Sequence, residues 1–262
     1  MKLLYFDYRM KIQYSETVSK CNFTIKCLPE TNVRQRIMDR TIELFPDIPY
    51  QTDRDGLKNL QIYGTNDVPH KEFEFHISGV AETGLAAYEM AVADEGEAMI
   101  FRHPHGLNAA GEKIRQYYQS LHAEAIEDDF ECALYLMHCL HRDFRYSRNV
   151  TTADTAAEAA FSLGSGVCQD LSHILIALLH LRKMTARYVT GFILGEGESH
   201  AWVEIRVGGQ WIGLDPTNDV PVADDHIRIG AGRDARDCRL NRGILHMNGT
   251  QIMDVHALVK EI

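Results

Sequence analysis

One cysteine in this sequence lies where its thiol could be activated as a nucleophile. Cys168 follows two glycines in the stretch GSGVCQDLSHILIALLHL, residues 164–181, and opens a strongly apolar segment that predicts a helix. The first turn of a helix carries unpaired N–H groups and the positive end of the macrodipole. We expect these groups to lower the pKa of Cys168 below about 8.5 and to hold an oxyanion later in a reaction. The alternative is a small, buried cysteine without reactivity.

A thiolate nucleophile needs a base, and one predicted hairpin offers a histidine with a carboxylate beside it. In ESHAWVEIRVGGQWIGLDPTN, residues 198–218, the glycine pair 208–209 is typical of a two-residue turn. Counting back from this turn places Trp202 opposite Asp215, so His200 lies diagonal to Asp215 on the same face. Such neighbours are about 7–8 Å apart at Cα, within reach of a side-chain hydrogen bond. A register shifted by one residue would put His200 and Asp215 on opposite faces.

Each of these two residues has a structural alternative. A histidine at a strand end is often a polar rim residue, and Asp-Pro after a strand is often only a turn. Together with the upstream cysteine, however, the pair favours nucleophilic catalysis. In this interpretation Cys168 is the nucleophile, His200 is the general base and Asp215 orients the histidine.

Four neighbouring residues are candidate supporting groups. Gln169 is expected to line an oxyanion site or to be a surface or capping residue, and the backbone N–H of Cys168 is the safer oxyanion donor. Trp202 is expected either to shield the His–Asp pair from water or simply to pack. Asn218 is expected to brace the DPTN turn through its side chain, and Tyr146 to approach the site from the segment before the Cys168 helix.

Other histidines and charged residues are assigned to structural roles. The stretch DDHIRIGAGRD predicts a salt-bridged structural loop, with a cleft edge as the alternative. The candidate residues in it are Asp225, His226, Arg233 and Asp234. His103 and His105 flank a proline without a nearby carboxylate or thiol, which is too weak a pattern to predict a metal site. His173 and His180 are expected on the face of the Cys168 helix.

The elements that must position these residues divide the chain into a β-rich part and a mixed part. Residues 1–80 alternate apolar and polar side chains, as along 4–14, and predict a small antiparallel β-sandwich. The ambiguous segment 34–45 is predicted to be a strand because its surroundings are β-rich. Helical periodicity follows at 111–125, 128–144, 154–163 and 168–183, and strand patterns return at 186–194, 200–207 and 210–215. Helices followed by strands predict an α+β fold.

Composition excludes several classes of protein. The chain has 262 residues, of which 45% are hydrophobic and 24% charged, which suffices for one large domain or two ordinary ones. The net charge of −10 argues against nucleic acid or an anionic membrane as a partner. The sequence shows neither a signal-peptide profile nor an apolar run of about 18 residues, so the predicted compartment is the cytoplasm. The six cysteines are then expected to be free thiols.

Taken in order, the stretches GVCQD, HAW, LDPTN and HIRIGAGRDARD resemble the bacterial transglutaminase-like superfamily, whose members are often described as cysteine proteases. The resemblance covers roughly residues 110–245, and the residues before 81 resemble the β-rich region found with that core. It implies a papain-like α+β core of helices packed on an antiparallel sheet at 106–262, preceded by a β-sandwich-like domain at 1–105. It also implies a Cys168–His200–Asp215 triad that works without a metal or an organic cofactor.

Acyl transfer through a thioester is the chemistry that the resemblance implies, with a peptide, a protein or another amide-bearing molecule as substrate. Amide or peptide hydrolysis is favoured over transglutaminase cross-linking because water, at about 55 M, is the default acceptor. A catalytically idle scaffold that binds peptide is the third alternative, and the three filled triad positions disfavour it. The stretch CRLNRG at 238–243 departs from the family's Pro-Val-Arg-Gly-like pattern, which bears on local shape or substrate preference.

Overall fold

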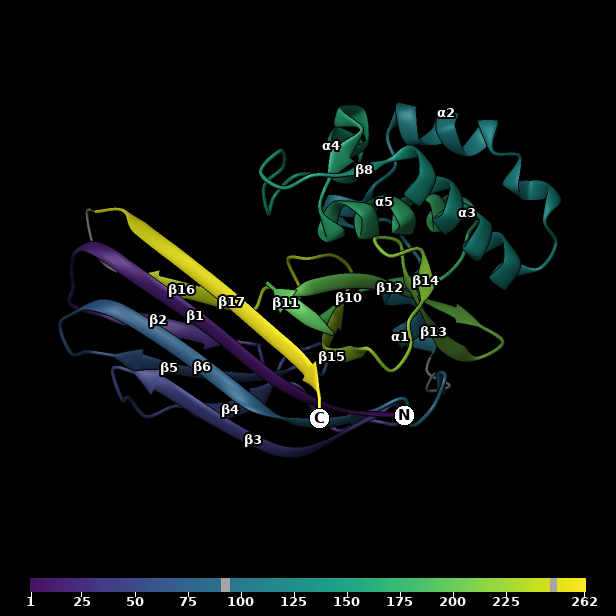
Figure 1. The fold of residues 1–262 in the computed structure, drawn as a ribbon. Coiled ribbons are helices and arrows are strands. Elements are labelled where there is room, and N and C mark those ends of the chain that lie inside the picture. The colour runs from purple at the N-terminus through teal and green to yellow at the C-terminus, as the bar shows by residue number, and fades with distance from the viewer. Residues whose placement is uncertain (91–94, 246–248) are drawn as a thin grey trace.

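The computed structural model describes residues 1–90, 95–245 and 249–262. Figure 1 shows helices gathered over one sheet and long antiparallel strands that form a β-rich part beside it. The two ends of the chain meet there, because the backbone N–H of Ile262 donates to the carbonyl of Leu3 at 3.0 Å. The predicted α+β class is confirmed.

Two antiparallel sheets build the β-rich part, because apolar and polar side chains alternate along their strands. The first has the order β11-β17-β1-β6-β3, and its strands are Gly195–Gly197, Gln251–Glu261, Lys2–Val18, His70–Thr83 and Gln35–Phe45. The second has the order β16-β2-β5-β4, and its strands are Asn241–Leu245, Cys21–Ile25, Leu60–Asn66 and Gln51–Arg54. Inward side chains of both sheets share one buried cluster, which includes Phe6, Ile62 and Phe75. The predicted sandwich and the predicted strand at 34–45 are confirmed.

The last strands of the chain return to this β-rich part. β17 pairs antiparallel with β1 over its whole length, and β16 pairs with β2. Ala257 and Val259 of β17 are buried in the cluster between the two sheets. In space β16 and β17 therefore belong with the N-terminal strands, although the sequence assigned them to the 106–262 core. The boundary between residues 105 and 106 stays a prediction.

A second sheet-and-helix part carries most of the candidate site residues. Its sheet has the order β14-β13-β12-β10-β15, and these strands are Val220–Pro221, Gln210–Asp215, His200–Val207, Ala186–Ile193 and His226–Gly232. The short β7, Glu89–Met90, pairs with β13. Four helices, α2 to α5, lie over this sheet in Figure 1, at Glu112–Ser120, Asp129–Asp143, Ala157–Leu163 and Cys168–Leu181.

Shorter elements complete this part of the chain. A helix α1 covers Glu95–Ile100, and 3-10 turns lie at Gly106–Asn108 and Ala123–Ala125. β8, Arg145–Tyr146, pairs in parallel with β9, Ser165–Gly166, just before α5. Within the described ranges, no helix is long and apolar enough to cross a membrane.

β12 divides its side chains between the two faces of its sheet. Alternate residues join the apolar core beneath α5, and these are Ala201, Val203 and Ile205. The opposite face is polar, and its buried Glu204 carboxylate accepts a hydrogen bond from Arg187 Nε at 2.7 Å. Burial favours the neutral acid, but the surrounding guanidinium groups, Arg187 first, lower the pKa of Glu204 to about 2. His200 and Trp202 lie at the start of β12, and His200 lines the same cavity as Cys168 of α5.

The hairpin that joins β12 to β13 has the predicted register. Val207 pairs with Gln210 across the turn, and continuing this ladder places Trp202 opposite Asp215. The two glycines of the turn have φ values of 56° and 78°, in the left-handed region that a two-residue turn of this kind requires. The turn therefore sets which residues of β12 and β13 share a face.

The turn yields a stability prediction. We expect Gly209→Ala to lower the free energy of unfolding by about 1–2 kcal/mol, because its φ of 78° penalises any side chain. Unfolding in urea measures the change. Gly56→Ala is the matched control, since an added Cβ there meets no atom within 4 Å and φ lies outside the left-handed region. Equal losses in the two variants would contradict this account of the turn.

Candidate active site

Cys168 is the first residue of α5, and its position is fixed by the turn before it. Gly164 ends α4 in the left-handed conformation, with φ of 65°. The Asp170 carboxylate reaches back and accepts hydrogen bonds from the Val167 N–H at 2.8 Å and the Thr151 hydroxyl at 2.7 Å. A Cβ on Gly166 would lie 2.4 Å from Asp170 Oδ2, so only glycine leaves room for this carboxylate.

The Cys168 side chain opens into a cavity of about 720 Å³ that also reaches His200. Cys168 is half-buried, whereas the other five cysteines are buried, and all six are free thiols. The cavity wall also carries Tyr146, Arg148 and Glu198. Among the six thiols, Cys168 is therefore the one with the readiest access for a molecule from solution.

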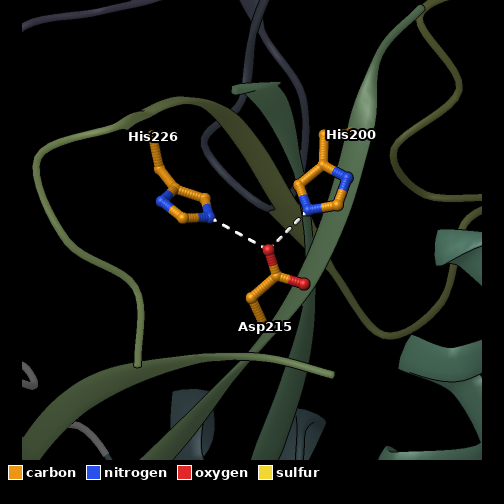
Figure 2. Close-up of side chains that lie close together, drawn as sticks. All are labelled: His200, Asp215 and His226. Carbon is orange, nitrogen blue, oxygen red and sulfur yellow. Dashed lines mark hydrogen bonds and ion pairs between the residues drawn. The ribbon is translucent and has the colours of Figure 1, made fainter. Parts of the chain in front are cut away.

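His200 lines the same cavity as this thiol and is bonded to a carboxylate. Its Nε2 lies 2.7 Å from Asp215 Oδ2, and its other ring nitrogen points away from Asp215 in Figure 2. Burial disfavours the charged imidazole, but hydrogen bonds and charge attraction from Asp215 and Cys168 outweigh burial and raise the pKa of His200 to about 10. These interactions favour the protonated form of His200, whose hydrogen-bonded partner is the Asp215 carboxylate.

Asp215 is held by donors from its own turn as well. Its Oδ2 accepts a hydrogen bond from Asn218 Nδ2 at 2.7 Å, and its Oδ1 accepts one from the Thr217 N–H at 2.9 Å. Burial favours the neutral acid, but these donors and the neighbouring imidazoles, His200 first, hold the pKa of Asp215 far below its usual range. Asn218 thus braces the turn through its side chain.

A second histidine contacts the same carboxylate. His226 Nε2 lies 3.1 Å from Asp215 Oδ2, so two imidazoles share one oxygen (Figure 2). The sequence assigned His226 to a structural loop or a cleft edge. The alternating pattern of HIRIGAG indicates a strand that begins at His226, but no local pattern shows that its side chain reaches Asp215.

His200, Asp215 and His226 also present the donor atoms that a transition metal prefers, all within 4.8 Å of one another. Their contacts of 2.7 and 3.1 Å are those of hydrogen bonds. Ligands about 2.0–2.1 Å from a tetrahedral zinc ion lie about 3.3 Å apart. The present spacing is therefore too tight for a metal unless Asp215 moves away from both rings.

Comparison with known proteins identifies the part of the chain that holds these residues. Residues 116–216 match the model of the Transglutaminase-like superfamily, and this span contains Cys168, His200 and Asp215. This part of the chain is a transglutaminase-like domain. The predicted family is confirmed for residues 116–216, and the predicted fold is confirmed by the structural match described next.

Relatives of the whole chain extend the match beyond the transglutaminase-like domain. An uncharacterized protein of Mycobacterium tuberculosis is 26% identical, over 95% of this chain and 89% of that protein. An uncharacterized protein of Mycobacterium leprae is 38% identical over 34% of this chain and 36% of its own length. The crystal structure titled "Putative Cysteine Protease" from Cytophaga hutchinsonii has a similar fold, with a TM-score of 0.80, 20% identity and coverage of 100% of this chain and 92% of that one.

The remaining candidate residues around the transglutaminase-like site differ in how near they lie to it. Trp202 is buried, and its ring centroid is 6.2 Å from that of His200. Tyr146 is exposed and lines the cavity. Gln169 also lines the cavity, but its Nε2 donates to the carbonyl of Ala153 at 3.2 Å and so has a structural partner.

The charged residues after the triad form structural contacts, apart from His226. Arg233 forms an ion pair with Asp237 at 2.8 Å, and Asp225 pairs with Lys2. Asp234 is buried and accepts the N–H of Leu107 at 3.1 Å. His105 contacts Asp234, whereas His173 and His180 bond to the backbone, at Ala235 and Phe101. The loop prediction is therefore confirmed for Arg233, and wrong for His226.

The ion pair of His200 and Asp215 yields a pH prediction. Because the pKa of His200 is raised, its ion pair with Asp215 stabilises the folded state fully below pH 6.5, the ordinary pKa of histidine. This contribution to stability is lost as the pH rises toward 10. Because the pKa of Asp215 is lowered, its carboxylate stabilises the folded state above pH 3.8, the ordinary pKa of aspartate. This contribution to stability is lost as the pH falls further into acid. We therefore expect Asp215→Asn to cost about 3 kcal/mol between about pH 4 and 6.5, and less toward pH 10.

Urea unfolding of wild type and Asp215→Asn across this pH range measures the effect. Asp219→Asn is the matched control, because Asp219 lies in the adjacent turn and pairs with the exposed His138. A cost of Asp215→Asn that stays constant up to pH 10 would contradict the raised pKa of His200.

Proposed function

We propose that this chain is a thiol-dependent acyl-transfer enzyme that cleaves amide or peptide bonds through Cys168, His200 and Asp215. One observation carries the proposal: His200 is hydrogen-bonded to Asp215 at 2.7 Å and lines, together with Cys168, one cavity that admits a substrate. A nucleophile, a base and an orienting acid in this order are the parts of a thiol acyl-transfer site. The similarity in fold to a protein titled a cysteine protease supports it.

The proposed reaction has two steps, the formation of a thioester and its hydrolysis. The Cys168 sulfur attacks the carbonyl carbon of the substrate as a thiolate, with its proton held by His200, and the carbonyl oxygen becomes an oxyanion. His200 then gives its proton to the leaving nitrogen, the C–N bond breaks and a thioester remains. Water attacks the thioester while His200 takes a proton from it, and the acid leaves as the C–S bond breaks. Asp215 keeps the imidazole oriented and offsets its charge throughout.

The proposed oxyanion site is the beginning of α5. As the first residues of the helix, Cys168 and Gln169 have backbone N–H groups that no carbonyl within the helix accepts. Such groups stabilise an oxyanion best when they are already in place before the reaction. The Gln169 side chain is less suited to this role, because it already donates to Ala153.

The proposed substrate is a peptide, a protein or another amide-bearing molecule. The cavity is open and lined by both acidic and basic side chains, Glu198 and Arg148 among them. Hydrolysis is the proposed outcome because water reaches an open site unless an amine excludes it. The alternative is transfer of the acyl group to an amine. An assay distinguishes it, because release of ammonia or amine would then depend on an added acceptor.

The proposed compartment is the cytoplasm, which six unpaired thiols support.

Thiol labelling tests whether Cys168 is activated. We expect iodoacetamide at neutral pH to alkylate Cys168 at least about tenfold faster than the five buried cysteines, because thiolate character and exposure both favour it. His200→Ala should slow the labelling of Cys168 by about tenfold, since the neighbouring cation is lost. His138→Ala, an exposed histidine paired with Asp219, is the matched control and should leave the rate unchanged.

Mass spectrometry of the digested protein measures each cysteine separately. Equal labelling of Cys168 in wild type and His200→Ala would contradict an activated thiol and favour an idle scaffold.

A screen with amide and peptide substrates then tests the reaction itself. Activity that survives Cys168→Ala would overturn the proposed mechanism.

A further inference from the structure

Two imidazoles meet one carboxylate oxygen in this structure, and the proposed reaction uses only one of them. Asp215 Oδ2 lies 2.7 Å from Nε2 of His200 and 3.1 Å from Nε2 of His226. Figure 2 shows the two rings approaching that oxygen from different directions. His226 opens β15, which is separated from the strand of Asp215 by β10 and β12 in the sheet order.

We propose that His226 is a positioning residue, which anchors the Asp215 carboxylate so that His200 keeps its free nitrogen directed at Cys168. The inference rests on the proposed function of these three residues. It concerns a role that His226 plays through Asp215, without contact with substrate.

The donors around Asp215 explain why an anchor is needed. Besides the two imidazoles, the carboxylate accepts hydrogen bonds from Asn218 Nδ2 and from the backbone N–H groups of Thr217 and Asn218. These donors belong to the same turn as Asp215 and move with it. Among the described residues, only His226 ties the carboxylate to a distant part of the sheet apart from His200, the residue that Asp215 orients. A rotation of the carboxylate would carry His200 with it, and a second fixed donor opposes that rotation.

The tautomers follow from the same contacts. An ionised carboxylate accepts hydrogen bonds and donates none, so both Nε2 atoms must carry a proton. This leaves Nδ1 of His200 for the thiol. It also places a proton on Nε2 of His226, whose buried Nδ1 has no hydrogen-bond partner among the residues that the structure describes.

His226 is held rigidly enough to act as an anchor. Its side chain is 4% exposed and packs edge-on against Trp202, with ring centroids 5.2 Å apart and planes at 77°. Trp202 is itself confined, because a Cβ on Gly191 would lie 2.4 Å from its ring. The imidazole cannot turn to another acceptor without displacing this packing.

Two substitutions separate the hydrogen bond from the packing. His226→Phe keeps a ring against Trp202 but removes the donor, whereas His226→Gln keeps an amide N–H that can reach Asp215. We expect His226→Phe to slow iodoacetamide labelling of Cys168 about tenfold, the effect of losing one charge-assisted hydrogen bond. His226→Gln should stay within about threefold of wild type. His173→Phe is the control for a lost buried hydrogen bond, since His173 accepts the Ala235 N–H and does not contact Asp215.

A spectroscopic measurement completes the test. In protein labelled with ¹⁵N-histidine, the Nε2–H signal of His200 should shift in His226→Phe and return toward wild type in His226→Gln, and His173→Phe should leave it unmoved. A His226→Phe protein that is folded and labels at the wild-type rate would overturn the inference, provided His200→Ala still slows labelling. If His200→Ala also labels like wild type, it is the proposed function that fails.

The wild-type protein decides the question even if His226→Phe does not fold. NMR of the labelled histidines reports which ring nitrogen of His226 carries the proton. A proton on Nε2 supports the anchor, and a proton on Nδ1 alone would overturn it because Nε2 could not then donate to Asp215.

Discussion

The hydrogen bond between Asp215 and His200 is the interaction on which the rest of the candidate site depends. It places a buried imidazole beside a buried carboxylate, and each group favours the charged form of the other. The bond forms only when β12 and β13 keep their register, and the Gly-Gly turn fixes that register. The turn at residues 208–209 therefore sets the orientation of the histidine that lines the same cavity as the thiol.

The β-rich part does more than cover one side of the transglutaminase-like domain. β11, in the connection between β10 and β12, pairs with β17 at the edge of the first sheet. The residues of β11 line the Cys168 cavity, and so does Ala257 of β17. This part of the cavity wall is thus held by the pairing of β11 with β17. This arrangement gives the β-rich part a direct influence on the shape of the proposed substrate site.

Local patterns in the sequence predicted the elements whose geometry is set by near neighbours. The hairpin register follows from alternation and a glycine pair, and the start of α5 follows from glycines before an apolar run. Contacts between distant segments could not be predicted in this way. His226 reaches Asp215 across the end of a sheet, and β17 joins β1 although Ile252 and Met253 are both exposed and break the alternation. The catalytic roles of the triad remain a proposal that only chemistry can test.

The most direct test of the account is a pH titration of His200 by NMR, in wild type and in Cys168→Ala. The account predicts a pKa near 10 in wild type, because both Asp215 and Cys168 raise it against burial. Removing the thiol should lower that pKa while the bond to Asp215 remains. A His200 that titrates near its ordinary value of 6.5 in both proteins would contradict the claim that it lies between the thiol and the carboxylate.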